Sequence, residues 1–155
     1  MRKLLLPILL IVSITIFAQK KNESAVVLEL FSSQGCSSCP SADKLLDVIK
    51  KEYETENIFV LSYHVDYWNR LGWKDPFSLS IYSDYQRDYG YKFNSRSIYT
   101  PQLVVNGNIH FAGSDRNRAI QSIQTYKKQP SFAVISLTNG LRKKTEIQLD
   151  YKVTG

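Results

Sequence analysis

The sequence predicts an α/β domain with a mixed sheet, and three observations support this fold class. Two apolar runs rich in β-branched residues, 24–31 and 58–63, flank a segment with helical periodicity, which is typical of a parallel strand–helix–strand unit. The dipeptide of Asn106 and Gly107 between two further apolar runs indicates an antiparallel hairpin. The length of 155 residues suits one domain rather than two separate cores.

The first unit spans residues 24–63. The run 24–31 predicts a strand that is covered on both faces. After it, apolar residues recur on one face of a helix, formed by Ala42, Leu45, Leu46, Ile49 and Tyr53. The run 58–63 predicts a second strand of the same buried kind, parallel to the first.

Residues 64–99 are an insertion that holds both tryptophans and most of the tyrosines. We expect a loop to about Pro76, a helix from about Phe77 to Tyr89, and a second loop. A stripe of tyrosines at positions 82, 85 and 89 is expected to lie in the core.

The rest of the chain predicts a hairpin, a helix and a ribbon. Residues 103–105 and 109–111 are the strands of the hairpin, and Ser114 or Asp115 can cap a helix that runs to about Lys128. Residues 131–155 end in alternating apolar and polar residues, which predicts a two-stranded β extension. Because two strands rarely stand alone in water, we expect this extension either to pack on the domain or to belong to a β-rich module that is incomplete in this chain.

The first eighteen residues have the pattern of a signal peptide. Arg2 and Lys3 form a cationic start, residues 4–17 are almost entirely apolar, and Ala18 precedes a polar break. The apolar run is shorter than the roughly twenty residues of a transmembrane helix. We expect cleavage near Ala18, which leaves 155 − 18 = 137 residues in a periplasmic or secreted form, without membrane attachment.

The composition excludes several classes of protein. With 43% hydrophobic and 22% charged residues, the chain is neither disordered nor fibrous. The formal charge of +6 falls to 6 − 2 = +4 without Arg2 and Lys3, and no basic stripe favours nucleic-acid binding. Two cysteines are too few for a disulfide-dense scaffold.

Cys36 and Cys39 are the predicted chemical centre. They stand three residues apart where a loop enters a helix, so one helical turn brings the thiols together. Free amide N–H groups and the helix dipole favour negative charge there, and we expect a lowered pKa for the Cys36 thiol. A thiolate attacks disulfides, and Cys39 is placed to resolve the mixed disulfide. The pattern predicts a redox-active dithiol.

Three other roles for the cysteine pair stay open. As a purely structural disulfide, the pair would close a four-residue loop and stabilise the fold by only about 2 kcal/mol. A structural zinc needs four ligands, and only His64 and His110 offer nitrogen. Cys36 and Cys39, with His64 as a third ligand, would suit Cu(I). The alternative function is therefore a copper-binding protein without turnover, whereas the redox interpretation needs no cofactor.

Thr100 and Pro101 are the second part of the expected site. A proline before a strand cannot donate to the ladder and usually marks an edge or a turn. In this topology a cis bond between Thr100 and Pro101 would present backbone N–H and C=O groups to an extended substrate beside the sulfurs. Only about 5–6% of X–Pro bonds are cis, so this expectation depends on a resemblance of the fold.

Four segments of the sequence resemble a known family. The order of a CxxC helix start, a strand, a Thr-Pro hairpin and a final helix resembles the thioredoxin fold. More narrowly, the chain resembles the exported thioredoxin-like proteins grouped as domain of unknown function 1223, through residues 29–40 (ELFSSQGCSSCP), 63–68 (YHVDYW), 71–77 (LGWKDPF) and 99–102 (YTPQ). The resemblance covers residues from about Ala25 to Asp115.

The resemblance implies a thioredoxin-like domain at 24–130 with an active CxxC, but the family has no established reaction. Departures are small: Ser41 replaces an expected proline, and Asn69 and Asn106 replace expected aspartates. Members usually continue into further β structure, so we expect this chain to be a truncated member.

The insertion is expected to carry specificity. His64 and Asp66 follow the second strand, where the ends of parallel strands line a crevice, so both side chains are candidates to reach the sulfurs. His64 would move a proton for Cys39, with Asp66 orienting it, or would make an ordinary hydrogen bond. His110 is expected to be structural, and Asp75 to be solvated or locally paired.

The aromatic residues of the insertion have two interpretations. Trp68 and Trp73, with Tyr67 and Phe77, either cover the sheet or form an apolar rim that binds extended polypeptide. The predicted function is an exported thiol–disulfide oxidoreductase whose partner is a protein or small-molecule disulfide or dithiol.

Overall fold

The computed structural model describes residues 24–131 and 133–155, so the expected signal peptide lies outside the described residues. A four-stranded sheet has the order β2-β1-β3-β4. Its strands are β1 (Val26–Ser32), β2 (Ile58–His64), β3 (Gln102–Val105) and β4 (Ile109–Ala112). β1 pairs with β2 in parallel and with β3 antiparallel, and β3 pairs antiparallel with β4. The mixed sheet is therefore the predicted one.

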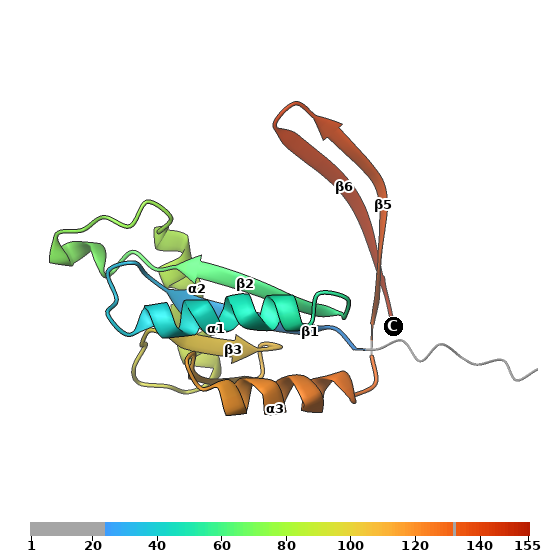
Figure 1. Cartoon of the computed structure of the whole chain (residues 1–155). Helices are drawn as coiled ribbons and strands as arrows, with labels where there is room; N and C mark the ends of the chain where they lie inside the picture. The colour runs from blue at the N-terminus through green and yellow to red at the C-terminus, as the bar shows by residue number, and fades with distance from the viewer. Residues whose placement is uncertain (1–23, 132) are drawn as a thin grey trace, which may run out of the picture.

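Three helices cover the two faces of the sheet (Figure 1). They are α1 (Cys39–Glu52), α2 (Ser80–Lys92) and α3 (Arg116–Lys127). α1 and α3 pack on one face around Leu28, Leu30 and Leu103, and α2 packs on the other around Phe31 and Val104. This arrangement is a thioredoxin-like fold with an insertion between β2 and β3. Within the described residues, no helix is long and apolar enough to cross a membrane.

Local sequence explains the element ends. Asn106 and Gly107 have positive φ of 48° and 64°, which the tight turn between β3 and β4 requires. The Asp115 carboxylate accepts the Arg118 N–H at 3.0 Å and so caps α3, as one of the two expected caps.

Two expectations, one about β2 and one about the insertion, are wrong in detail. β2 is an edge strand, and its Phe59 and Leu61 are 54% and 41% exposed, so it is not buried on both faces. α2 begins at Ser80 and not near Phe77, and the short helix η1 (Asn69–Leu71) precedes it.

The C-terminal extension forms the predicted hairpin from β5 (Val134–Lys143) and β6 (Glu146–Thr154). It projects away from the sheet in Figure 1, and every side chain described in its strands is exposed.

A buried carboxylate joins β1 to α2. Glu29 is 6% exposed, and its two oxygens accept the hydroxyls of Tyr85 at 2.7 Å and Tyr89 at 2.6 Å. Burial, with the neighbouring carboxylate, raises the pKa of Tyr85 to about 12. Burial and the same carboxylate also raise the pKa of Tyr89. Both phenols therefore stay protonated in the folded chain above the pH at which free tyrosine ionises.

We expect stability to fall above about pH 10, where free tyrosine ionises. There the unfolded chain loses protons that the folded chain retains, so the free energy of unfolding decreases until the folded phenols ionise. Each phenol contributes a slope of about 1.4 kcal/mol per pH unit. Urea unfolding at several pH values should show a shallower slope in Tyr85→Phe/Tyr89→Phe. The exposed Tyr91→Phe is the control, and equal slopes in all three proteins would contradict the assignment.

Candidate active site at the Cys36–Cys39 disulfide

Cys36 and Cys39 form a disulfide at the N-terminus of α1. Their sulfurs are 2.09 Å apart and their Cα atoms 5.4 Å apart. Cys36 is 2% exposed and Cys39 is fully buried. Cys36 is therefore the more accessible of the two, although most of its surface is covered.

The start of α1 supplies the local chemistry. Ser38 is the N-cap residue, Pro40 stands at the start of the helix, and the Cys39 N–H donates to the Cys36 carbonyl at 3.2 Å. The Ser38 hydroxyl lies 3.5 Å from the Cys36 sulfur. The Cys36 sulfur therefore lies at the N-terminal end of α1, next to a hydroxyl group.

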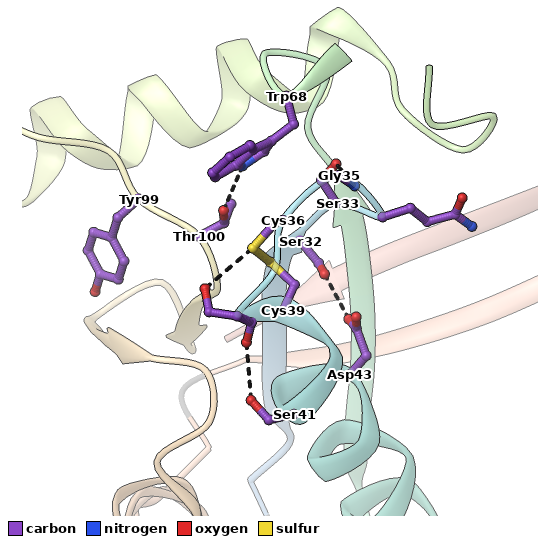
Figure 2. Close-up of a disulfide and its surroundings, with 12 residues drawn as sticks. Ser32, Ser33, Gly35, Cys36, Cys39, Ser41, Asp43, Trp68, Tyr99 and Thr100 are labelled. Atoms are coloured by element: carbon purple, nitrogen blue, oxygen red, sulfur yellow. Dashed lines mark hydrogen bonds between the residues drawn. A yellow bond between two sulfur atoms is a disulfide. The ribbon is translucent and has the colours of Figure 1, made fainter. Parts of the chain in front are cut away.

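A short network lies beneath the cysteines. Ser32 is fully buried at the end of β1, and its hydroxyl donates to the Asp43 carboxylate of α1 at 2.8 Å (Figure 2). This bond fixes the strand end against the helix that carries Cys39. Sequence analysis missed Ser32 and Asp43, because their i to i+11 spacing across a loop follows neither strand nor helix periodicity.

The Thr100 and Pro101 loop packs against the same helix start. The bond between Thr100 and Pro101 is cis. The Pro101 carbonyl accepts the Gly113 N–H at 2.9 Å. A Cβ atom built on Gly113 would lie 3.1 Å from the Ala42 Cβ and 3.2 Å from the Pro101 Cβ. Pro101 therefore lies close to the first turns of α1, the helix that begins at Cys39.

Trp68 connects the cysteine loop to the Thr100 loop. Its indole N–H donates to the Thr100 hydroxyl at 2.8 Å, and its Cβ would contact a Cβ on Gly35 at 3.2 Å. Figure 2 shows the indole and Thr100 on the Cys36 side of the disulfide. The cysteine loop, the start of the insertion and the Thr100 loop thus meet here.

His64 pairs with Asp75 and not with Asp66. The His64 Nδ1 atom lies 2.7 Å from the Asp75 carboxylate. Asp66 instead accepts the Ser83 hydroxyl at 2.5 Å, which joins the insertion to α2. The expectation that Asp66 orients His64 is therefore wrong. Asp75, which was expected to be solvated or locally paired, is 1% exposed and is paired with His64.

The environment of Asp75 favours its ionised form. Burial raises the pKa of the carboxyl group. The hydrogen bonds from the Gln34 N–H, His64 and the Phe77 N–H outweigh that effect, so the pKa of Asp75 lies below its usual value. A buried, charged carboxylate therefore lies next to the loop that carries Cys36.

The aromatic residues of the insertion divide between the two interpretations. Tyr67 and Trp68 pack against the core on the α2 face. Trp73 and Phe77 are 61% and 63% exposed, and the Trp73 indole N–H donates to the Gln34 side chain at 3.3 Å. Of these four residues, only Trp73 and Phe77 can form an apolar rim. The His110 Nδ1 atom is hydrogen-bonded to the Tyr99 hydroxyl at 2.9 Å, a contact that suits a structural role.

The copper alternative requires Cys36, Cys39 and His64 to converge. In the part of the chain that the structure describes, no three His, Cys, Asp or Glu side chains gather as metal ligands would. The structure thus does not bring these three residues together around a common point.

Comparisons with known proteins give one family and several solved structures. Residues 27–155 match the family model described as protein of unknown function (DUF1223). No curated protein matches the sequence. A crystal structure of a protein from Agrobacterium tumefaciens is 37% identical with a TM-score of 0.65, over 75% of this chain and 52% of that chain. The chain thus spans about half the length of that protein.

Two other solved structures are more distant. A malarial protein is 17% identical with a TM-score of 0.42, over 66% of this chain and 97% of that one. The germline thioredoxin Deadhead of Drosophila melanogaster is 14% identical with a TM-score of 0.41, over 66% of this chain and 81% of that one.

Proposed function

The chain belongs to the DUF1223 family, and from that premise we propose that it is an exported thiol–disulfide oxidoreductase. The observation that carries the proposal is the disulfide of Cys36 and Cys39 at a helix N-terminus, beside Thr100 and Pro101. The cationic and apolar N-terminal sequence supports export, and an exported disulfide persists in an oxidising compartment.

The proposed reaction is a reversible exchange of two electrons. In the reducing direction, the Cys36 thiolate attacks one sulfur of a substrate disulfide, and the other substrate sulfur leaves as a thiolate that takes up a proton. The Cys39 thiol then loses its proton and attacks the Cys36 sulfur, which releases the second substrate sulfur as a thiolate that takes up this proton. The substrate gains two electrons and two protons, and the protein becomes the disulfide. A substrate dithiol drives the same steps in reverse.

The proposed substrate is a disulfide in an extended polypeptide. Trp73 and Phe77 supply an exposed apolar surface on the insertion, and Trp73 is bound to Gln34, two residues before Cys36. Apolar side chains that flank a substrate cysteine would contact this surface, while the backbone at Thr100 would pair with the substrate chain.

Trapping of the mixed disulfide tests the proposal. Reduced Cys39→Ser protein, mixed with a peptide that holds one disulfide flanked by apolar residues, should form a covalent adduct on Cys36 that dithiothreitol cleaves. The adduct persists because no second thiol resolves it. Mass spectrometry measures the adduct, and the same variant with Cys36 alkylated is the control. If the unblocked variant forms no adduct, thiol–disulfide exchange is not the function.

A further inference from the structure

Asp75 binds three segments around the cysteine loop with one carboxylate. Its side chain is completely buried. Oδ2 accepts the Gln34 N–H at 2.8 Å and lies 2.7 Å from His64 Nδ1, and Oδ1 accepts the Phe77 N–H at 2.9 Å. The carboxylate therefore joins the cysteine loop, the end of β2 and the segment before α2.

The backbone of Asp75 is itself held in place. Its N–H donates to the Asn69 side chain at 3.0 Å, and its carbonyl accepts the Ser78 hydroxyl at 2.8 Å and the Ser78 N–H at 3.1 Å. A carboxylate on a fixed backbone with fixed donors is preorganised and does not adapt to movement of the cysteine loop.

The amide that Asp75 binds belongs to the turn that leads into Cys36. Gln34 stands two residues before Cys36 within a tight turn. In this turn the Cys36 N–H donates to the Ser33 carbonyl at 3.1 Å, and the Gly35 N–H donates to the Ser33 hydroxyl at 3.1 Å. Since Trp73 also binds the Gln34 side chain, the insertion holds this residue at two points. Release of Gln34 would let the whole turn move.

We propose that Asp75 is a positioning residue of the dithiol site. Through Gln34 it keeps the disulfide covered, with Cys36 only 2% exposed, and keeps Cys36 in register with the Thr100 loop. The proposed effect of Asp75 on exchange with a polypeptide rests on the proposed function. Its proposed effect on the exposure of the disulfide does not. Loss of this carboxylate should affect small and large reactants in opposite directions.

Two rates separate positioning from a purely structural role. The first is reduction of the oxidised full chain by dithiothreitol, and the second is single-turnover reduction of the disulfide peptide by the reduced protein. Asp75→Ala should raise the first rate about tenfold, because the loosened turn exposes the disulfide. It should lower the second at least about tenfold, because Cys36 is no longer aligned. Asp75→Asn keeps one oxygen for the Gln34 N–H and should lie between.

Ser83→Ala is the matched control. Ser83 is buried, and its hydroxyl binds Asp66 of the same insertion rather than the cysteine loop. This variant should lower the midpoint of urea unfolding and leave the ratio of the two rates within about twofold. If Asp75→Ala and Asp75→Asn shift both rates in the same direction, or match the control, Asp75 is structural and the proposal is wrong. If wild type reduces no peptide, the proposed function fails, and the dithiothreitol comparison still decides the role of Asp75.

Discussion

Replacement of Cys36 with serine is expected to abolish disulfide exchange. A serine hydroxyl forms no disulfide, and the remaining thiol of Cys39 is fully buried at the start of α1. Reduction of the disulfide peptide should therefore fall to the rate without protein, a loss of at least about a thousandfold. A peptide-reduction assay with protein in excess measures this loss.

Comparison with Cys39→Ser excludes a folding artefact. Both variants lose the same disulfide, whose four-residue loop contributes about 2 kcal/mol, so their unfolding free energies should be similar. Only Cys39→Ser should still react with the peptide, and only in its first step. Ser37→Ala, an exposed position between the cysteines, should retain exchange. A Cys36→Ser protein that reacts as fast as Cys39→Ser would assign the attacking thiol to Cys39 instead.

Two strand pairings, β1 with β2 and β3 with β4, were predictable because they follow from local sequence. Periodicity placed α1 between β1 and β2, and the turn residues Asn106 and Gly107 placed β3 beside β4. The buried character of β2 was wrong, because a run of apolar residues gives no information on which strand lies at the edge. That depends on tertiary order, and at the edge Phe59 remains exposed.

The start of α2 was misplaced because Leu79, the residue before the helix, is extended, with φ of −131° and ψ of 140°. The Phe77 N–H donates to the Asp75 carboxylate, and the Leu79 N–H donates to the His64 carbonyl at 3.1 Å. These bonds hold the segment before Ser80 in its loop conformation. Apolar periodicity alone does not reveal contacts of this kind.

The place of the cysteine pair at the start of α1 follows from its spacing, whereas the cis bond of Thr100 and Pro101 was expected only through the resemblance of the fold. The family resemblance is confirmed by the match over residues 27–155. The partner of His64 was not predictable from the sequence. Asp66 is nearer in sequence, but Gly72, directly after η1, has a left-handed φ of 101°, and the chain then brings Asp75 to His64. Gly72 and the proline after Asp75 were the available signs of a turn.

Gly113→Ala is expected to disturb both the core and the site. A Cβ at this position would lie 2.6 Å from Leu30 Cδ1, 3.1 Å from the Ala42 Cβ and 3.2 Å from the Pro101 Cβ. Leu30 can change rotamer at a cost, but the other two atoms are fixed to their backbones. The α1 start and the Pro101 loop must then move apart. We expect a loss of about 2–3 kcal/mol in urea unfolding and slower peptide reduction.

A second substitution separates the two effects. Leu30→Val in the Gly113→Ala background removes part of the closest contact, so the two changes should be coupled and stability should partly recover. Leu30→Val alone should cost about 1 kcal/mol. Peptide reduction should remain slow in the double variant, because Ala42 and Pro101 still meet the added methyl group and the sulfurs stay displaced from the Thr100 backbone. Recovery of stability and of peptide reduction together would show that the spacing between α1 and the Pro101 loop does not limit exchange.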